Sequence, residues 1–415
     1  MKVNGGQREG SSAGGRSDGA ILPKAVNHST VGSPTIRVAL LREGSAVESR
    51  SMCLYADHLV RGLSAPELVA QSPDWARGRA SHLDRHVTRY WRIPQRLVSH
   101  SDVYHILDHA NAHWIRSLPP DRTVVTCHDL MLLKLLTGDV RSREGTPLLA
   151  AAAFRWSVSH LRQAAAVVCD SNATRDDARR LLGCAPERLH VVYPGLATAF
   201  RPLPDRSEMR AQLRRSFGVT APVMLLHVGH RYFYKNVEGL LHALAWLIRK
   251  GRHNVQLVKV GEDLTEGQQG LIRRLGLTSH VRLAGAVGLG DLVRLYNAAD
   301  ALVYPSLAEG FGWPIVEAMA CGTPVVCSAR GALAEVAGTA ASLVDPEDPV
   351  DIAQGVTRIL DDEPFRKELV QRGLDRSRAF GWDEALTRLR ALYVTVAEGS
   401  GHSLLPSPRV RGGEG

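Results

Sequence analysis

The stretch 225-LLHVGHRYFYKNVEGLLHAL-244 decides the fold class of this chain. It starts as an apolar strand that ends at Gly229, continues as a loop that carries Arg231 and Lys235, and becomes a helical pattern near Asn236. A strand followed by a loop and a helix is the repeating unit of a parallel α/β sheet. Ligands of such sheets bind beyond the carboxyl ends of the strands, so we expect this loop to face a ligand.

The same unit recurs on both sides of this stretch. In the first half we predict strands at residues 36–41, 103–107, 124–127, 166–169 and 189–192, with helices at 52–63 and 173–182. In the second half we predict strands at 224–228, 255–260, 281–283, 301–304 and 324–327, with helices at 236–249, 266–275, 291–299, 314–320 and 364–378. Two successive series of this kind predict two doubly wound parallel-sheet domains with a ligand cleft between them.

Proline, glycine and serine mark where each series begins and ends. Pro202 and Pro204 interrupt the pattern between the two series, and both termini are rich in Gly, Ser and Pro. The 415 residues agree with two domains, because one core seldom serves a chain of this length. We predict an unstructured tail at 1–34, an N-terminal domain at 35–200, a C-terminal domain at 201–382, a helix at 383–398 that braces the two domains, and a second tail at 399–415.

The composition is that of an ordinary globular protein with a basic charge. Hydrophobic residues make up 44% and charged residues 22% of the chain, which excludes a wholly disordered protein. The formal charge of +9 suggests an anionic partner. The six cysteines form no CxxC pair, which indicates buried reduced thiols and argues against a zinc site. No run approaches the roughly 20 apolar residues that span a bilayer, so we expect a cytoplasmic protein.

The densest motif is 309-EGFGWPIVEAMACGTPVV-326. Glycines at a strand-to-helix turn let backbone N–H groups approach a ligand closely, and the N-terminus of the helix that starts near Pro314 favours phosphate. Glu309 and Glu317 stand eight residues apart around Gly310 and Gly312. Two carboxylates beside a phosphate would repel it unless they bind neutral hydroxyls, which sugars supply. The motif therefore predicts a site for a phosphate-bearing sugar.

Cations and a histidine occupy two further strand ends. Taken alone, Arg231 and Lys235 would be exposed loop cations, but at a strand end beside a helix N-terminus they suit a diphosphate. His128 follows the strand of 123-TVVTCHDL-130. A neutral imidazole there could hydrogen-bond a sugar hydroxyl or shuttle a proton, and it could equally be structural.

These stretches resemble retaining glycosyltransferases of family 4, a GT-B class related to glycogen and sucrose-type synthases. The resemblance runs from about residue 36 to 396. Besides the motif at 309–326, the matching pieces are 51-SMCLYADHLVRGL-63, 102-DVYHILDH-109, VTCHDL, 170-DSNATRDDARR-180, 193-YPG-195, GHRYFYKN and 328-SARGALAEVAGTAASLVDPEDP-349. The resemblance implies a GT-B architecture of two facing Rossmann-like domains.

The resemblance also implies a role for each motif residue. Arg231 and Lys235 would neutralise the diphosphate of a nucleotide-sugar donor, Glu309 would bind the hydroxyls of the transferred sugar, and Glu317 would bind the ribose. The backbone of Gly310, Phe311 and Gly312 would contact sugar and phosphate, and His128 would lie against the sugar near the reacting carbon. The new bond would keep the donor's anomeric configuration through front-face attack. No protein nucleophile, catalytic metal or cofactor would be required.

Two positions depart from the family pattern. The family often has tandem glycines after the first strand, whereas 42-REGSAVESR-50 contains only Gly44. Many members also place an arginine directly after the glycine that ends the first strand of the second half. In this chain that glycine is Gly229, and we call the loop after it, which carries Arg231 and Lys235, the cation loop. Here His230 occupies that place and Arg231 follows it. Of the two cations, Lys235 therefore fits the family's diphosphate-binding pattern better than Arg231.

Rival functions differ in what they require of the sequence. A nicotinamide oxidoreductase needs a GxGxxG turn after a strand with an acidic residue downstream, and no predicted strand is followed by one. Nucleic-acid binding would need aromatic side chains that stack on bases, but aromatic residues make up only 6% of the chain. A non-catalytic sugar-nucleotide-binding or partner subunit is the serious alternative, and a phosphorylase-like or hydrolytic relative is the runner-up among enzymes.

The substrates are only partly predicted. The GHRYFYKN form of the cation loop favours mannose and GDP-mannose over a UDP-sugar, while saccharide, glycolipid and other lipid-linked acceptors stay open, as in polysaccharide biosynthesis. The arginine-rich stretch 77–96 suggests peripheral contact with an anionic membrane at its inner face, although we favour a solvated helix face as its explanation.

Overall fold

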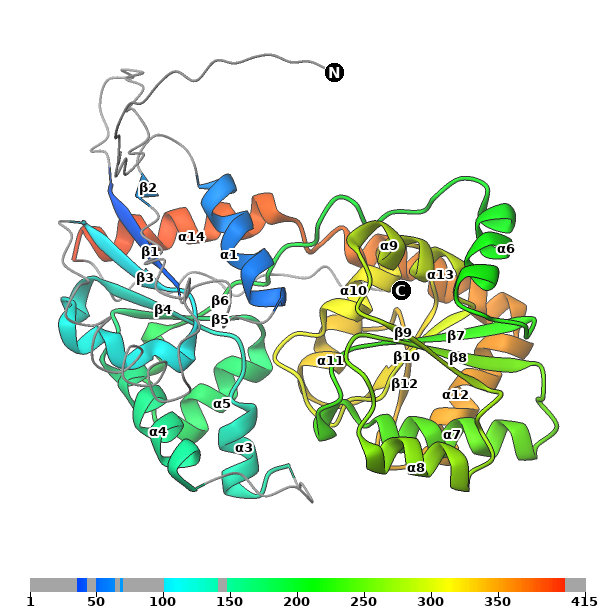
Figure 1. Cartoon of the computed structure of the whole chain (residues 1–415). Helices are drawn as coiled ribbons and strands as arrows, with labels where there is room; N and C mark the ends of the chain where they lie inside the picture. The colour runs from blue at the N-terminus through cyan, green and yellow to red at the C-terminus, as the bar shows by residue number, and fades with distance from the viewer. Residues whose placement is uncertain (1–35, 43–49, 64–67, 70–100, 141–147, 400–415) are drawn as a thin grey trace, which may run out of the picture. The chain divides into compact units, whose positions relative to one another are not determined.

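Two six-stranded sheets form the framework of the residues that the structure describes (Figure 1). This computed structural model describes residues 36–42, 50–63, 68–69, 101–140 and 148–399. Every strand pair in both sheets is parallel. The predicted α/β class with two parallel sheets is therefore confirmed.

The first sheet has the strand order β2-β1-β3-β4-β5-β6. Its strands are β1 (Val38–Leu41), β2 (Leu68–Val69), β3 (Val103–Ile106), β4 (Thr123–Cys127), β5 (Ala166–Cys169) and β6 (Leu189–Val191). Because β3, β4 and β5 are neighbours and parallel, the residues that follow them meet at one edge of the sheet. That edge carries the predicted residue His128, which directly follows β4.

The second sheet has the strand order β12-β11-β10-β7-β8-β9. Its strands are β7 (Val223–Val228), β8 (Val255–Val260), β9 (Val281–Gly285), β10 (Ala301–Tyr304), β11 (Val325–Ser328) and β12 (Ser342–Val344). The strand order reverses between β7 and β10, which is where doubly wound sheets bind their ligands. The cation loop follows β7 and the acidic motif follows β10, so both lie at this switch point.

Most predicted elements are present, and the omissions have physical causes. All ten predicted strands are found, whereas β2 and β12 were missed because strands of two and three residues carry no recognisable period. The predicted helices correspond to α1 (Arg50–Gly62), α5 (Asn172–Leu182), α7 (Val237–Arg249), α8 (Glu266–Arg274), α9 (Leu289–Ala298), α10 (Trp313–Ala320), α13 (Glu363–Ser377) and α14 (Trp382–Ala397). The helices without a prediction are α3 (Met131–Thr137), α4 (Leu148–Val158), α6 (Arg206–Ser216), α11 (Gly331–Ala337) and α12 (Pro349–Asp361).

The starts of α7 and α10 each differ by one residue from the prediction. Asn236 is the N-cap of α7 rather than its first residue: it has a left-handed backbone (φ 54°) and its side chain accepts a hydrogen bond from Gly239 N. Short polar side chains at that position satisfy a backbone donor that the helix leaves free. The helix α10 starts at Trp313, so Pro314 is its second residue.

Both sheets bury their two faces under helices, as all-parallel sheets do. In the second sheet, apolar side chains of α7 and α8 pack on one face and those of α9 and α10 on the other, which Figure 1 shows below and above the strands. In the first sheet, α1 and α14 cover one face and α4 and α5 the other. The last helix, α14, thus packs against the first sheet, while α13 before it packs against α10 and α12 of the second half.

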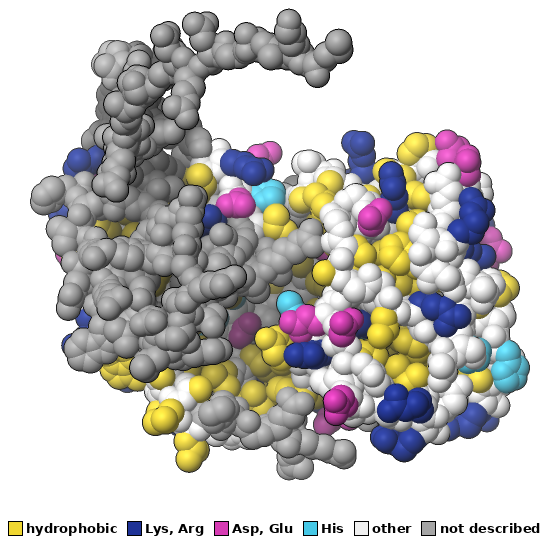
Figure 2. Space-filling model, viewed as in Figure 1, with side chains coloured by type: hydrophobic (Ala, Val, Ile, Leu, Met, Phe, Trp, Pro, Cys, Tyr) yellow, Lys and Arg dark blue, Asp and Glu magenta, His cyan; other side chains and the backbone are white. Residues whose placement is uncertain are grey.

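Several predictions concern residues outside this description. The arginine-rich stretch 77–96, most of the loop 42–50 and the two tails lie outside the described residues. Membrane contact and cytoplasmic location therefore stay predictions of the sequence. Among the described helices, none has the length and apolar character that crossing a bilayer requires. On the face in Figure 2, basic side chains of the second half are interspersed with acidic and apolar ones.

Candidate functional site

A lysine, a tyrosine and a glutamate meet at the switch point of the second sheet. Lys235 Nζ donates to Glu309 Oε1 over 2.6 Å and also lies 2.8 Å from the Tyr304 hydroxyl. The Tyr304 hydroxyl in turn donates to Glu309 Oε1 over 2.9 Å. The side chains of Lys235 and Glu309 are only 10% and 11% exposed. Two residues that the sequence predicted separately, 74 positions apart, thus form one buried ion pair.

The local backbone explains this meeting. Lys235 ends a short 3-10 turn, η7 (Phe233–Lys235), directly before the N-cap of α7, and Glu309 lies in the loop between β10 and α10. The two loops are tied together because Leu307 N donates to Tyr234 O over 2.7 Å. Burial, and then the neighbouring Glu309, raise the pKa of Tyr304, so this hydroxyl stays protonated and donates to the carboxylate.

Glu317 lies in α10, directly after the loop that carries Glu309, and it accepts a hydrogen bond from a second tyrosine. The Tyr296 hydroxyl donates to Glu317 Oε2 over 2.7 Å. Tyr296 is fully buried, and burial followed by the Glu317 charge raises its pKa. Both acidic residues of the motif are therefore held by a buried tyrosine hydroxyl that the sequence did not single out.

Replacing Tyr296 by phenylalanine tests how much this bond holds Glu317. We expect the Tyr296→Phe variant to lose about 2 kcal/mol in its free energy of unfolding, because hydrogen bonds to charged groups contribute about that much. Denaturant unfolding measures the change. Tyr232→Phe is the matched control, since Tyr232 is half exposed and should change stability little. An unfolding free energy equal to wild type in Tyr296→Phe would contradict the proposed importance of the bond.

Arg231 takes a different position from Lys235. Its side chain is 52% exposed, and its Nε lies 3.9 Å from Glu262 Oε2. Glu262 also lies 3.4 Å from His230 Nδ1, so the two consecutive residues His230 and Arg231 share one carboxylate. The structure brings Lys235 and Glu309 together and places Arg231 with Glu262.

A second lysine, Lys259, donates hydrogen bonds to the main chain at the start of the cation loop. Lys259 of β8 donates to the carbonyl of Gly229 over 2.9 Å and also to the carbonyl of Glu262. Burial lowers the pKa of Lys259 to about 8. No sequence motif marked this residue, because it lies within the mostly apolar strand β8. Lys259 fixes the start of the loop that carries Arg231 and the loop after β8 that carries Glu262.

The glycine-rich turn abuts the first half of the chain. A Cβ atom on Gly310 would lie 1.8 Å from His128 O, so only glycine permits this approach. Phe311 buries its side chain beside Tyr193 and Phe380 and can offer a ligand only its main chain. Gly312 has a left-handed backbone (φ 102°) and is the N-cap of α10. The conformation of the turn therefore depends on the close approach at Gly310, the buried ring of Phe311 and the left-handed backbone of Gly312.

Both ring nitrogens of His128 face protein acceptors. Its Nδ1 lies 2.8 Å from Asp170 Oδ2 and its Nε2 lies 2.8 Å from Leu107 O. The place of His128 against the transferred sugar stays a prediction. Asp170 was missed, although it follows β5 as His128 follows β4, and the same strand-end argument would have found it.

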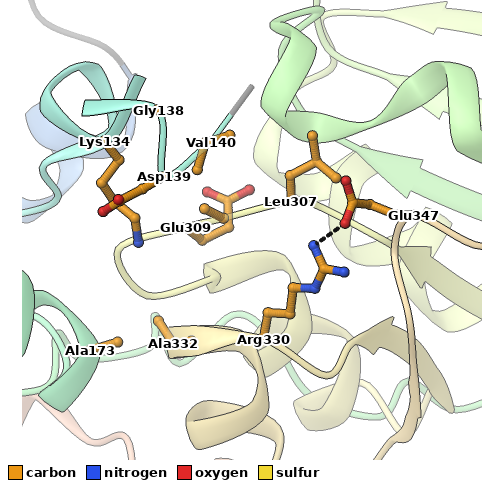
Figure 3. A pocket seen from close by; sticks show the side chains of 12 residues that line it. Lys134, Gly138, Asp139, Val140, Ala173, Leu307, Glu309, Arg330, Ala332 and Glu347 are labelled. Atoms are coloured by element: carbon orange, nitrogen blue, oxygen red, sulfur yellow. Dashed lines mark ion pairs between the residues drawn. The ribbon is translucent and has the colours of Figure 1, made fainter. Parts of the chain in front are cut away.

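A cavity of about 540 Å³ lies beside Glu309 and is lined from both halves of the chain. In Figure 3 the Glu309 side chain lies across this cavity from Lys134 and Asp139, and Arg330 pairs with Glu347 on another side. The lining residues are Lys134, Gly138, Asp139, Val140, Ala173, Leu307, Ala308, Glu309, Arg330, Gly331, Ala332 and Glu347. Within the described part of the chain, no group of three or more His, Cys, Asp or Glu residues could hold a metal ion.

This fold is found in solved glycosyltransferase structures. The chain aligns with a sucrose-phosphate synthase from Thermosynechococcus elongatus at a TM-score of 0.70 and 21% identity, over 87% of this chain and 99% of that one. It aligns with Anabaena HepE in complex with UDP and glucose at a TM-score of 0.67 and 20% identity, over 87% and 100%. The architecture is therefore GT-B.

Family models cover both halves. Residues 209–376 match the model described as glycosyl transferases group 1, and residues 44–200 match glycosyltransferase family 4. The chain belongs to the group 1 glycosyltransferases.

Curated relatives are similar over part of their length. A D-inositol 3-phosphate glycosyltransferase 1 of Catenulispora acidiphila is 36% identical over 246 residues, which are 56% of this chain and 58% of that protein. The O-antigen chain mannosyltransferase B of Escherichia coli is 32% identical over 237 residues, 56% of this chain and 61% of that protein. The chain thus spans about three fifths of the length of these relatives.

Proposed function

We propose that this protein transfers a hexose from a nucleoside diphosphate sugar to a hydroxyl acceptor, with retention of the anomeric configuration. The observation that carries the proposal is the buried trio of Lys235, Tyr304 and Glu309 at the switch point of the second sheet. A lysine suits a diphosphate and a carboxylate suits sugar hydroxyls, so one donor molecule can satisfy both. The membership of the group 1 glycosyltransferases supports the same reaction class.

Each residue of the site has a part in binding the donor. Lys235, with Arg231 at the more exposed edge, neutralises the diphosphate, and Glu309 accepts hydrogen bonds from the transferred sugar. Glu317, oriented by Tyr296, binds the ribose. The main chain of Gly310, Phe311 and Gly312 leads into α10, whose N-terminal end favours the phosphates.

The chemical step needs little from protein side chains. The acceptor oxygen attacks the anomeric carbon on the face from which the diphosphate departs. The bond to the leaving phosphate breaks, and that phosphate takes the acceptor's proton. The positive charge of Lys235 offsets the negative charge that grows on the leaving group. His128, whose carbonyl abuts Gly310, stands beside the reacting end of the donor in this arrangement.

The mixed lining of the cavity suits a neutral acceptor or the transferred sugar itself. Lys134 pairs with Asp177, and Arg330 pairs with Asp345 and Glu347, so these cations are already neutralised. A saccharide can bind such a surface through hydroxyls that both donate and accept. We propose a saccharide or lipid-linked saccharide as acceptor.

Nucleotide release from a panel of donors tests the function. We expect release from one GDP- or UDP-hexose and little from the others. GDP-mannose comes first because a relative is named a mannosyltransferase, and UDP-glucose second because HepE binds UDP and glucose. Proton NMR of the product's anomeric coupling then tests retention. Donor binding without release, with a saccharide panel present, would instead favour the non-catalytic alternative, and no binding at all would contradict the donor site.

A further inference from the structure

The ring of His128 joins the ends of three neighbouring strands. It follows β4, its Nε2 reaches Leu107 O after β3, and its Nδ1 reaches Asp170 Oδ2 after β5, both over 2.8 Å. Its side chain is 12% exposed and that of Asp170 is 8% exposed. Water therefore contributes little to holding the ring, and its orientation depends on these two partners.

The partners decide how many protons the ring carries. A backbone carbonyl only accepts hydrogen bonds, so Nε2 must carry a proton to contact Leu107 O at this distance. An ionised carboxylate also only accepts, so Nδ1 facing Asp170 must carry one as well. A histidine with both N–H groups is an imidazolium. A neutral ring keeps both contacts only if the proton between Nδ1 and Oδ2 sits on Asp170.

The surrounding charges favour the proton on the ring. Burial lowers the pKa of His128, but the charge of Asp170 and its hydrogen bond, with a smaller contribution from Asp108, raise it to about 9. His105 stays neutral beside it, because burial, and then His128 itself, lower the pKa of His105 to about 3. The other titratable neighbours are Tyr55, whose ring edge faces His128; His109, whose Nδ1 faces Asp108; and Asp129, the next residue.

The main chain of His128 connects this ring to the glycine-rich turn. His128 O lies directly against Gly310, where even a Cβ atom would not fit. The Thr174 hydroxyl lies within hydrogen-bond distance of both His128 O and Gly310 O, at 3.4 and 3.2 Å. Any rotation of the His128 backbone would therefore displace the turn that carries Glu309 and Gly310.

We propose that Asp170 is a positioning residue that holds His128 as a doubly hydrogen-bonded imidazolium, and that this clamp fixes the His128 main chain against the donor-binding turn. The proposal rests on the proposed function for the identity of that turn. Asp170 touches no substrate in this scheme and acts only through His128. Loss of one ring proton to solvent would remove one of the two bonds, since Leu107 O and an ionised Asp170 only accept, and would loosen the strand end beside Gly310.

The protonation state is measurable without turnover. Long-range ¹H–¹⁵N NMR of the ring nitrogens distinguishes an imidazolium from a neutral ring, and a His128→Gln variant identifies the resonance among the 17 histidines. We expect His128 to carry two N–H groups from pH 6 to 8. One N–H at pH 7, with the other proton absent or on Asp170, would overturn the proposal. This result stands even if no donor is ever turned over, so it separates the clamp from the proposed function.

An Asp170→Asn variant tests the role of the carboxylate charge. Without that charge, the pKa of His128 falls, while the amide can still donate a hydrogen bond to an unprotonated Nδ1. We therefore expect the ring of this variant to carry two N–H groups near pH 5.5 but only one at pH 8, where wild type keeps both. Asp176→Asn is the matched control: Asp176 is 64% exposed, pairs with Arg175 and should leave both N–H groups of His128 in place at pH 8. Two N–H groups on His128 in Asp170→Asn at pH 8 would show that the carboxylate charge does not hold the second proton, and would overturn the proposal.

Discussion

The Lys235→Ala variant should lose about 10²–10³-fold in donor turnover and also become less stable. Lys235 is the buried cation that would face the leaving diphosphate, and no other basic side chain in the described contacts of Glu309 replaces it. Its removal also leaves Glu309 buried with only the Tyr304 hydroxyl as its described partner. Breaking a buried ion pair on one side costs about 3 kcal/mol, because the remaining charge is uncompensated.

The two effects separate in a double variant. In Lys235→Ala/Glu309→Ala the orphaned carboxylate is gone, so we expect the unfolding free energy to recover part of the loss, while turnover stays at least as low as in Lys235→Ala. Denaturant unfolding and nucleotide release measure the two quantities on the same preparations. If the double variant were no more stable than Lys235→Ala, the stability loss would have another cause than an unpaired Glu309.

Arg231→Ala is the matched control for charge. It removes one positive charge from the same loop, but Arg231 is half exposed and 3.9 Å from its acidic partner, so its stability effect should be small. We expect weaker donor binding and an unchanged unfolding free energy. Wild-type turnover in Lys235→Ala, or a larger loss in Arg231→Ala than in Lys235→Ala, would contradict the assignment of Lys235 as the principal diphosphate cation.

The sequence was sufficient to predict the framework and the strand ends on which the motif residues lie. Strands such as β5, β8 and β10 are short and rich in apolar, β-branched residues, and their predicted limits agree with the structure. The residues at their carboxyl ends were then placed by the general geometry of parallel sheets. This is why Lys235 and Glu309 could be assigned to one site, although 74 residues separate them.

The partners of those residues could not be predicted in the same way. Tyr304 and Tyr296 are apolar-looking members of a strand and a helix, and their hydroxyls gain importance only from which carboxylate folds against them. The protonation of His128 depends on Asp170 and on a carbonyl from a third strand, which requires the strand order β3-β4-β5. Local pattern gives the residue type at a strand end, whereas strand order decides what it touches.

The Gly310→Ala variant should lose at least about 10²-fold in turnover although it adds only one methyl group. The added Cβ would meet His128 O at 1.8 Å and Asp129 Cβ at 2.9 Å. The first of these atoms belongs to the backbone at the end of β4, so no rotation of a side chain relieves the contact. The turn from Glu309 to Gly312 must move instead, and misplacing a binding group by about 1 Å can cost that much in rate.

Stability should change as well, and a second glycine provides the control. Overpacking a tight contact usually costs about 1–3 kcal/mol, so we expect Gly310→Ala to unfold at lower denaturant than wild type. Gly290→Ala makes the same chemical change in α9, where the new Cβ would meet nothing within 4 Å. That variant should be as active as wild type and slightly more stable, because alanine suits a helix better than glycine. Equal activity in the two variants would mean that the turn does not need its close approach to His128, and the donor-binding role of this turn would then have to be abandoned.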